Sequence, residues 1–137
     1  NYQRFVSSHR RAFLNLASQY YREGDTTAAL TVLNKGFELF PNSVIPYDYA
    51  NAAMIPLMHR LGDKDRAIKL GKQMADESIE LLKYLRKEQI RYSSREYNAL
   101  NILEIITDAM KEFGQQEAYE RYNQTYQNML SKSQFSR

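Results

Sequence analysis

The chain has 137 residues, a length that suits one domain of ordinary size. Its 19 Lys and Arg against 16 Asp and Glu give a net charge of +3 that is dispersed along the chain, which argues against nucleic acid as a partner. The absence of cysteine excludes disulfides, thiolate metal sites and a cysteine nucleophile. No run approaches the roughly 18 consecutive apolar residues of a membrane span. Because the chain begins at Asn1 with no signal-peptide pattern, we expect it to be a piece of a longer protein.

The first twelve residues predict the start of a helix, because they contain few residues that break one. This start is basic, and it could touch anionic lipid head groups or acidic partners. Three arginines with a single large apolar side chain make a weak amphipathic anchor, however. We therefore favour a solvated extension of the first helix, with Arg4, Phe5, His9, Arg10 and Arg11.

Residues 13–41 predict two helices joined at a glycine. Apolar residues at i, i+3, i+4 and i+7 mark one face of the first helix. Gly24 can end it, because glycine takes the positive φ of a helix C-cap without steric cost, and Asp25 or Thr26 can cap the next helix. Small residues on the apolar faces of both helices should let the two helices approach closely. The second helix should end before Pro41. The apolar face of the first helix consists of Phe13, Leu16, Ala17 and Tyr20, and that of the second consists of Ala29, Leu33, Gly36, Phe37 and Phe40.

This segment resembles the tetratricopeptide repeat, a helical hairpin of about 34 residues. The resemblance implies that similar hairpins stack into a short solenoid. It implies an architecture and does not name a ligand. The matching positions are Phe13, Leu16, Ala17, Tyr20, Gly24, Ala29, Leu33, Gly36 and Pro41.

A second hairpin should follow over residues 46–90. Pro46 suits the first turn of its first helix, which we expect to run to about Leu61 with a kink at Pro56. Gly62 should end this helix as Gly24 ends the first one. A long fourth helix should then run from about residue 64 to residue 90. Its far face is interpreted as solvated and carries Lys69, Lys72, Asp76, Glu80, Lys83 and Lys87, with Glu80 and Lys83 an opposite-charge pair.

A third hairpin is predicted over residues 94–131, after a break near residues 92–94. Ser94 is the expected N-cap of the fifth helix, and Gly114 is the expected third hinge. This hairpin fits the repeat pattern poorly, as terminal repeats of solenoids often do. Three tyrosines stand at core spacings, namely Tyr97, Tyr119 and Tyr122.

The fold prediction is therefore all-α. We expect a single domain over residues 1–137, a short helical-repeat solenoid of six helices. They form three antiparallel hairpins at about residues 3–40, 46–90 and 94–131.

No catalytic or metal site is predicted. His9 and His59 are 50 residues apart and neither has a partner histidine at helical spacing, so a zinc site is not expected. Glu104, Asp108 and Glu112 follow one another at i+4 spacing and repel one another. We interpret them first as a solvated face, second as an acidic groove for a basic peptide, and third as an acid/base pair. No cofactor is expected.

A narrower resemblance covers most of residues 1–85. The chain is similar there to the C-terminal soluble region of bacterial multi-span membrane proteins that resemble protein O-mannosyltransferases. This implies a non-catalytic module, facing the periplasm or alternatively the cytoplasm, that is tethered to a sugar-transferring membrane portion. The residues that carry it are Phe40 and Pro41, the tetrapeptide Pro46, Tyr47, Asp48 and Tyr49, and Ala75 and Asp76 ahead of Leu82 and Tyr84.

The first helix of each hairpin should line a concave face that is basic and aromatic at one end and acidic at the other. The expected function is binding of a peptide or partner protein, without catalysis; the alternative is an accessory domain that positions an acceptor or glycan for a membrane glycosyltransferase. A free-standing enzyme has no motif in its support, and a homodimer through the fourth helix stays open. The expected binding residues are Arg11, Leu14, Ser18, Tyr21, Arg22, Tyr49, Ala52, His59, Arg60, Asn101, Glu104 and Asp108.

Overall fold

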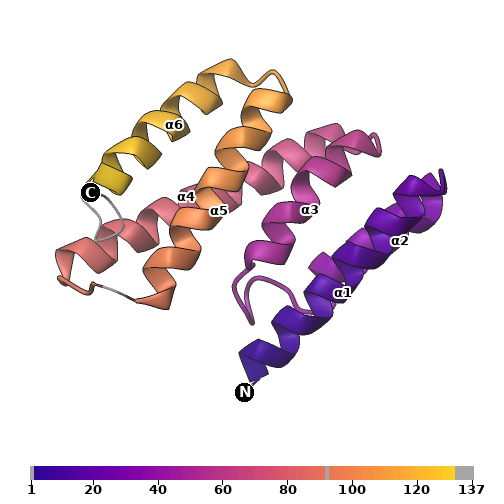
Figure 1. The fold of residues 1–137 in the computed structure, drawn as a ribbon, viewed down its shortest axis with the longest axis horizontal. Helices are drawn as coiled ribbons and strands as arrows, with labels where there is room; N and C mark the ends of the chain where they lie inside the picture. Colours follow the sequence, from indigo (N-terminus) through magenta and orange to yellow (C-terminus); the bar gives the residue numbers. More distant parts are fainter. Residues whose placement is uncertain (1, 92, 132–137) are drawn as a thin grey trace. The chain divides into compact units, whose positions relative to one another are not determined.

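The computed structural model describes residues 2–91 and 93–131, and every regular element within them is an α-helix. The all-α class predicted from the sequence is therefore confirmed (Figure 1). None of the described helices is long and apolar enough to cross a membrane. The helices are α1 (Tyr2–Arg22), α2 (Thr26–Glu38), α3 (Tyr49–Arg60), α4 (Lys64–Lys87), α5 (Ser94–Glu112) and α6 (Gln116–Ser131).

The chain forms two compact units, residues 1–67 and residues 68–137. The first unit contains α1, α2, α3 and the first turn of α4. The second contains the rest of α4 with α5 and α6. The predicted groove draws on helices of both units, so its residues fall into two separate sets.

Three glycines make the turns between paired helices, as the sequence predicts. Gly24, Gly62 and Gly114 have φ angles of 80°, 101° and 74°. An added Cβ at any of them would meet nothing within 4 Å. Glycine is therefore needed at these positions for its backbone conformation and not for space.

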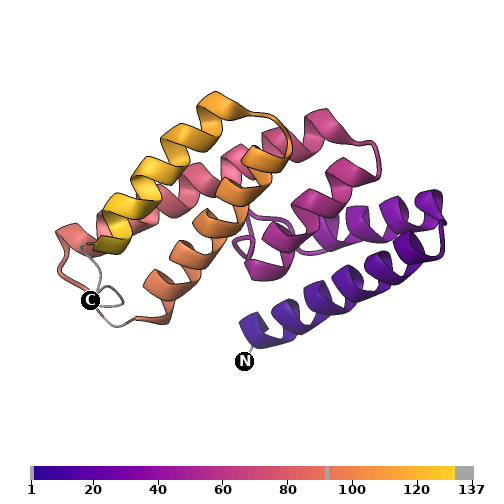
Figure 2. The same ribbon diagram turned by 45° about the horizontal axis from the view of Figure 1, so that its top comes forward.

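In the first unit, α1 and α2 pack side by side as an antiparallel pair, and α3 packs against both (Figure 2). Gly36 of α2 is buried, and a Cβ there would lie only 2.7 Å from Cε of Met54 and 3.6 Å from Cβ of Phe13. Gly36 was predicted to let α1 and α2 approach closely. Its lack of a side chain leaves room for α3 even more than for α1. The fully buried side chains of this unit include Val6, Ala17, Ala29, Leu33, Met54, Ile55 and Met58.

In the second unit, α5 and α6 pack together, and a buried tyrosine joins α6 to α4. The hydroxyl of Tyr122 donates to Oδ1 of Asp76 at 3.0 Å. Asp76 was predicted to be one of several solvated charges. It is exposed, as predicted, and it also has this specific partner. The predicted pair of Glu80 and Lys83 is confirmed, with Oε1 and Nζ 3.6 Å apart. The apolar core includes Leu82, Leu85, Leu103, Ile106 and Met110.

Three predicted helix ends shift by a few residues. The N-cap of α5 is Ser93 rather than Ser94, because Oγ of Ser93 accepts from the backbone N of Glu96 at 3.1 Å. α3 begins at Tyr49, so Pro46 precedes the helix and its carbonyl oxygen instead accepts a hydrogen bond from a side chain of α1. α4 ends at Lys87, ahead of a left-handed residue at position 89.

Two further expectations concern Pro56 and Tyr97. α3 continues through Pro56 to Arg60, so the proline does not end the helix, and the kink stays a prediction. Tyr97 was expected in the core, but its side chain is 54% exposed. The residues that fill the core on this part of α5 are Ala99, Leu100, Ile102 and Leu103.

Candidate functional site

The predicted binding residues of the first unit lie on α1 and α3. Arg11, Tyr21 and Arg22 of α1 are exposed, and so are Tyr49 and Arg60 of α3. These five side chains are at the surface of the unit. Leu14, Ser18 and His59 are half-buried.

Ala52 is a correction to the predicted set, because its side chain is fully buried. The reason is that Ala52 lies on the buried side of α3, together with Ala50, Asn51, Met54 and Ile55. The residues of α3 that are exposed or half-buried, and so within reach of a ligand, are Tyr49, Ala53, Pro56, His59 and Arg60.

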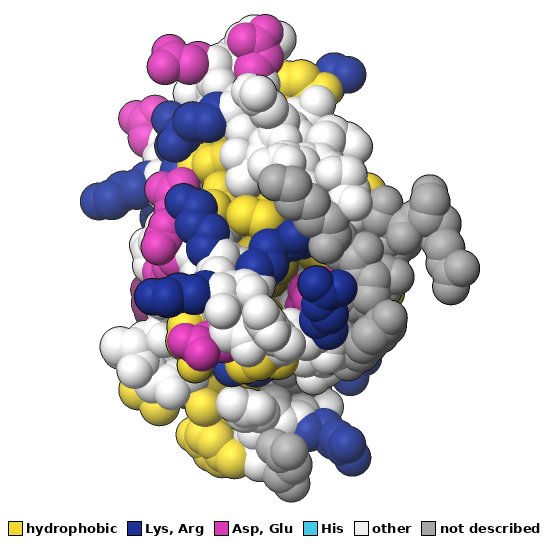
Figure 3. All heavy atoms as spheres, turned by 90° about the vertical axis from the view of Figure 1, so that its left-hand side faces the viewer, with side chains coloured by type: hydrophobic (Ala, Val, Ile, Leu, Met, Phe, Trp, Pro, Cys, Tyr) yellow, Lys and Arg dark blue, Asp and Glu magenta, His cyan; other side chains and the backbone are white. Residues whose placement is uncertain are grey.

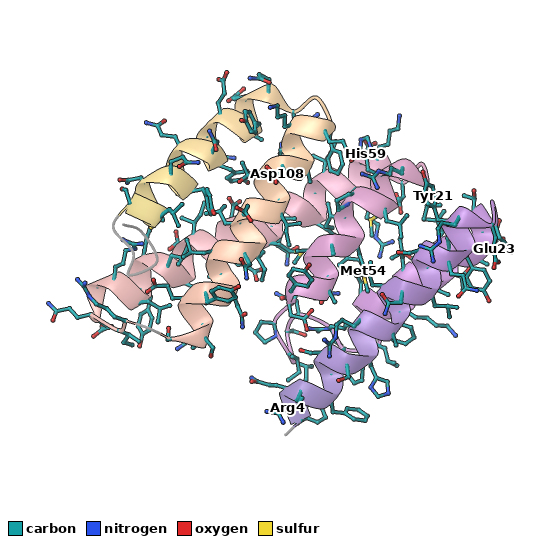
Figure 4. All side chains as sticks on the ribbon, in the orientation of Figure 1. Arg4, Tyr21, Glu23, Met54, His59 and Asp108 are labelled. Atoms are coloured by element: carbon teal, nitrogen blue, oxygen red, sulfur yellow. The ribbon has the colours of Figure 1, made fainter. Side chains whose placement is uncertain are left out.

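Tyr21 and His59 lie at the same end of the first unit, where α1 and α3 finish (Figure 4). Arg22 and Arg60 belong to the same two helix ends. This end of the unit carries aromatic and basic side chains together with the acidic Glu23, so a basic and aromatic end of the groove stays a prediction. Tyr21 is 41% exposed, so its ring offers apolar area to a partner.

In the second unit, four residues form one exposed row along α5. Tyr97, Asn101, Glu104 and Asp108 are spaced at i, i+4, i+7 and i+11, which places them on one face of the helix. Tyr97, Glu104 and Asp108 are exposed and Asn101 is half-buried. We call this row the α5 face. Tyr97 lies four residues before Asn101, which is one helical turn. This spacing could have added Tyr97 to the binding residues predicted from the sequence.

The carboxylate of Glu104 has a fixed hydrogen-bond donor. The hydroxyl of Tyr126 on α6 donates to its Oε2 at 2.8 Å. Burial, with the hydrogen bond to Glu104 and the charges of Glu104 and Asp108 adding to it, raises the pKa of Tyr126 to about 12. At neutral pH this tyrosine is therefore a donor that holds Glu104 in place while the charge of Glu104 stays available to a cation.

A hollow of about 300 Å³ opens beside the first turn of α6 in the second unit. Lys72, Glu117 and Arg121 contribute its charged walls. The guanidinium of Arg121 also lies 4.7 Å from the centre of the Tyr122 ring, so it is already engaged by a neighbour. Sequence reasoning missed this hollow, because Lys72 and Arg121 are 49 positions apart.

Charges of both signs are mixed on one face of the molecule. Figure 3 shows one face on which Lys and Arg side chains are interspersed with Asp and Glu, without a broad area of one sign. Within residues 2–91 and 93–131, no group of three or more His, Asp or Glu side chains is placed to hold a metal ion.

The two candidate surfaces are thus the α5 face and the end of the first unit that carries Tyr21 and His59. Their union in one concave groove stays a prediction. Comparison with known protein families, with curated proteins and with solved structures finds no match for this chain.

Proposed function

We propose that this protein is a non-catalytic helical-repeat module that binds a basic peptide or a basic segment of a partner protein. The observation that carries the proposal is the α5 face, where an exposed tyrosine and two exposed carboxylates stand in one row. Tyrosine is a favoured anchor in protein interfaces because it offers rigid area with a polar tip. The carboxylates supply the complementary charge and steer the approach of a cationic partner.

The α5 face belongs to a rigid helix, which favours binding. The opposite side of α5 is buried through Leu103, Ile106 and Met110, and the hydrogen bond from Tyr126 restrains Glu104. A side chain that is already ordered loses less entropy when a partner arrives. The α5 face is therefore preorganised for a ligand.

The helical-repeat part of the proposal rests on the turns and the packing. Gly24, Gly62 and Gly114 each end a helix in the left-handed conformation. Ala29 and Gly36 are buried where a repeat hairpin needs small residues. These features support a tetratricopeptide-like stack, an architecture that commonly presents ligand-binding surfaces.

The test compares two charge-matched variants against an array of synthetic Lys- and Arg-rich peptides, with affinities measured by fluorescence anisotropy. Glu104→Lys with Asp108→Lys should abolish binding. Glu77→Lys with Glu120→Lys makes the same change in net charge at exposed sites on α4 and α6, and should retain it. Equal loss in both variants would mean that only net charge matters, and full binding by the first variant would exclude the α5 face.

A second candidate function is an accessory domain that positions an acceptor or glycan beside a membrane glycosyltransferase. Tyr21, Tyr49 and Tyr97 are all exposed, and tyrosine rings can stack on sugars. The α5 face, which carries Tyr97, would then select oligosaccharides over basic peptides. A glycan array with the Tyr97→Ala variant as control tests this, and membrane spans encoded upstream of Asn1 would add support.

A further inference from the structure

The last turns of α6 lie beside the α5 face. The hydroxyl of Tyr126 on α6 donates to Oε2 of Glu104 at 2.8 Å, which fixes the level at which the two helices meet. α5 and α6 pack against each other as an antiparallel pair that turns at Gly114 (Figure 1). From Tyr126 the helix continues to Ser131, an advance of about 7.5 Å toward the N-terminal end of α5. α6 therefore ends close to the level of Tyr97, where the α5 face begins.

The residues that follow α6 have the opposite charge to the α5 face. Residues 132–137, which we call the C-terminal segment, lie outside the described part of the chain, and their sequence is KSQFSR. They include Lys132, Phe135 and Arg137 and no acidic residue. The α5 face presents two exposed carboxylates and the ring of Tyr97, which is 54% exposed. The C-terminal segment thus has the composition of the basic peptide ligand that we propose for this face, with an aromatic ring added.

The C-terminal segment is long enough to reach the α5 face without any change in α6. Six extended residues span at most about 20 Å, whereas packed helices are only about 8–10 Å apart. Phe135 comes four residues after Ser131, a reach of about 13 Å that brings its ring to Tyr97. Glu104 lies about 10 Å farther along α5 than Tyr97. Arg137 covers that distance with two further residues of backbone and its long side chain. The aromatic ring and one cation of the segment therefore match the order of groups on the face.

We propose that the C-terminal segment binds the α5 face of its own chain and competes there with the basic ligand. This inference rests on the proposed function, since it assigns an internal ligand to the same surface. A segment attached this close to its site has an effective concentration in the millimolar range. Even a contact that is weak for a separate peptide therefore occupies the face for much of the time. A partner binds only when the segment is displaced, so the segment lowers the apparent affinity of the module.

A second copy of the chain is a poorer donor of this segment than the chain itself. In a micromolar solution, a neighbouring molecule offers the same residues at a concentration about a thousandfold lower than the effective concentration of the attached segment. The attraction between the opposite charges is also short-ranged, because salt screens it beyond about 10 Å. Contact within one chain is therefore favoured.

The first experiment observes the segment directly, before any ligand is added. The chain contains no tryptophan, so Phe135→Trp introduces a single fluorophore into the segment. Docking on the α5 face should shift its emission to shorter wavelength, and salt should reverse the shift. Glu104→Lys with Asp108→Lys should abolish the shift. Glu77→Lys with Glu120→Lys, the same change in net charge at other exposed sites, should leave it unchanged.

The second experiment measures how strongly the segment opposes a ligand. Lys- and Arg-rich peptides are titrated into the full chain and into a chain shortened to residues 1–131. A segment that occupies the face for about three quarters of the time weakens binding about fourfold, so we expect the shortened chain to gain at least that factor. Lys132→Gln with Arg137→Gln should produce most of this gain. Lys69→Gln with Lys87→Gln on α4 makes the same change in net charge and should produce almost none.

The contribution of the aromatic ring is tested without a change in charge. Phe135→Ser should raise peptide affinity about twofold or more, because an apolar ring loses its contact with the face. Tyr84→Ser, at an exposed side chain of α4, should have no effect. Circular dichroism and the unfolding temperature verify that each variant folds.

Several outcomes would overturn the inference. One is a tryptophan emission that is the same with and without the two carboxylates of the α5 face, and another is an equal gain in the segment variant and its α4 control. An emission shift that appears only as the protein concentration rises would assign the segment to a second copy. If the shortened chain binds no peptide, the proposed function fails, and the tryptophan emission alone decides this inference. If it binds peptide no more tightly than the full chain does, the function stands and the inference fails.

Discussion

Nη1 of Arg10 lies 3.5 Å from Oδ2 of Asp48, although the arginine side chain is fully buried. The same guanidinium donates to the carbonyl oxygens of Phe40, Ile45 and Pro46. Its face also lies 5.5 Å from the centre of the Tyr47 ring. One charged side chain thus organises the whole connection between α2 and α3.

Replacing Arg10 by Met should therefore cost about 3–5 kcal/mol of unfolding free energy, because three carbonyl oxygens and Asp48 would lose their donor. Urea unfolding followed by circular dichroism measures this. Arg11→Met is the control, since Arg11 is the exposed neighbour and its loss should cost less than about 0.5 kcal/mol. A similar, small loss in both variants would show that the Arg10 network contributes little.

Asp48 should be more sensitive than an ordinary helix cap. It caps α3 by accepting from the backbone N of Ala50 at 3.0 Å, and it also accepts from Oγ of Ser7 at 2.8 Å. Ser93, by comparison, serves only as the N-cap of α5. We expect Ser93→Ala to cost about 1 kcal/mol and Asp48→Ala roughly 3 kcal/mol, because the buried arginine would also lose its counter-charge. Equal costs in urea unfolding would contradict this difference.

Alkaline pH should weaken the second unit through Tyr122 and Tyr126. Burial first, and then the hydrogen bond to Asp76, raises the pKa of Tyr122 from 10.0 to about 12, and Tyr126 reaches a similar value beside Glu104. The folded state keeps these protons longer than the unfolded state does. Their contribution is therefore complete below pH 10 and is lost as the pH rises to about 12.

The measurement is the free energy of unfolding at several pH values above 9, for the parent chain and for Tyr122→Phe with Tyr126→Phe. The variant should be less stable at pH 8, since it lacks two hydrogen bonds, and its stability should fall less steeply between pH 10 and 12. Parallel curves for the two proteins would mean that these tyrosines do not carry the pH dependence.

The turn glycines should respond to backbone conformation alone. Gly62→Ala should cost about 1 kcal/mol, because alanine disfavours a φ of 101° although the space is open. Gly62→Asn should cost less, since asparagine tolerates the left-handed region better. Thermal unfolding of the two variants compares these costs, and a loss that grows with side-chain size would indicate a steric cause instead.

The sequence by itself predicted the helices and their turns. Helical spacing of apolar residues and the left-handed preference of glycine act over a few residues, so Gly24, Gly62 and Gly114 could be recognised without a structure. The same local reasoning paired Glu80 with Lys83, which are one turn apart. It missed the N-cap of α5 by one residue, because Ser93 and Ser94 are equally good caps on sequence grounds.

Only the tertiary structure decided which polar and aromatic side chains are buried, and with whom. Arg10 was assigned to a solvated helix start, yet it is buried because carbonyl oxygens 30 and 35 positions away converge on it. Phe5 gains its neighbour Phe40 in the same way, and Asp76 its partner Tyr122. Hydrophobic periodicity places a residue on a face of its own helix, but it does not say which other segment packs there. Such pairings come from long-range packing.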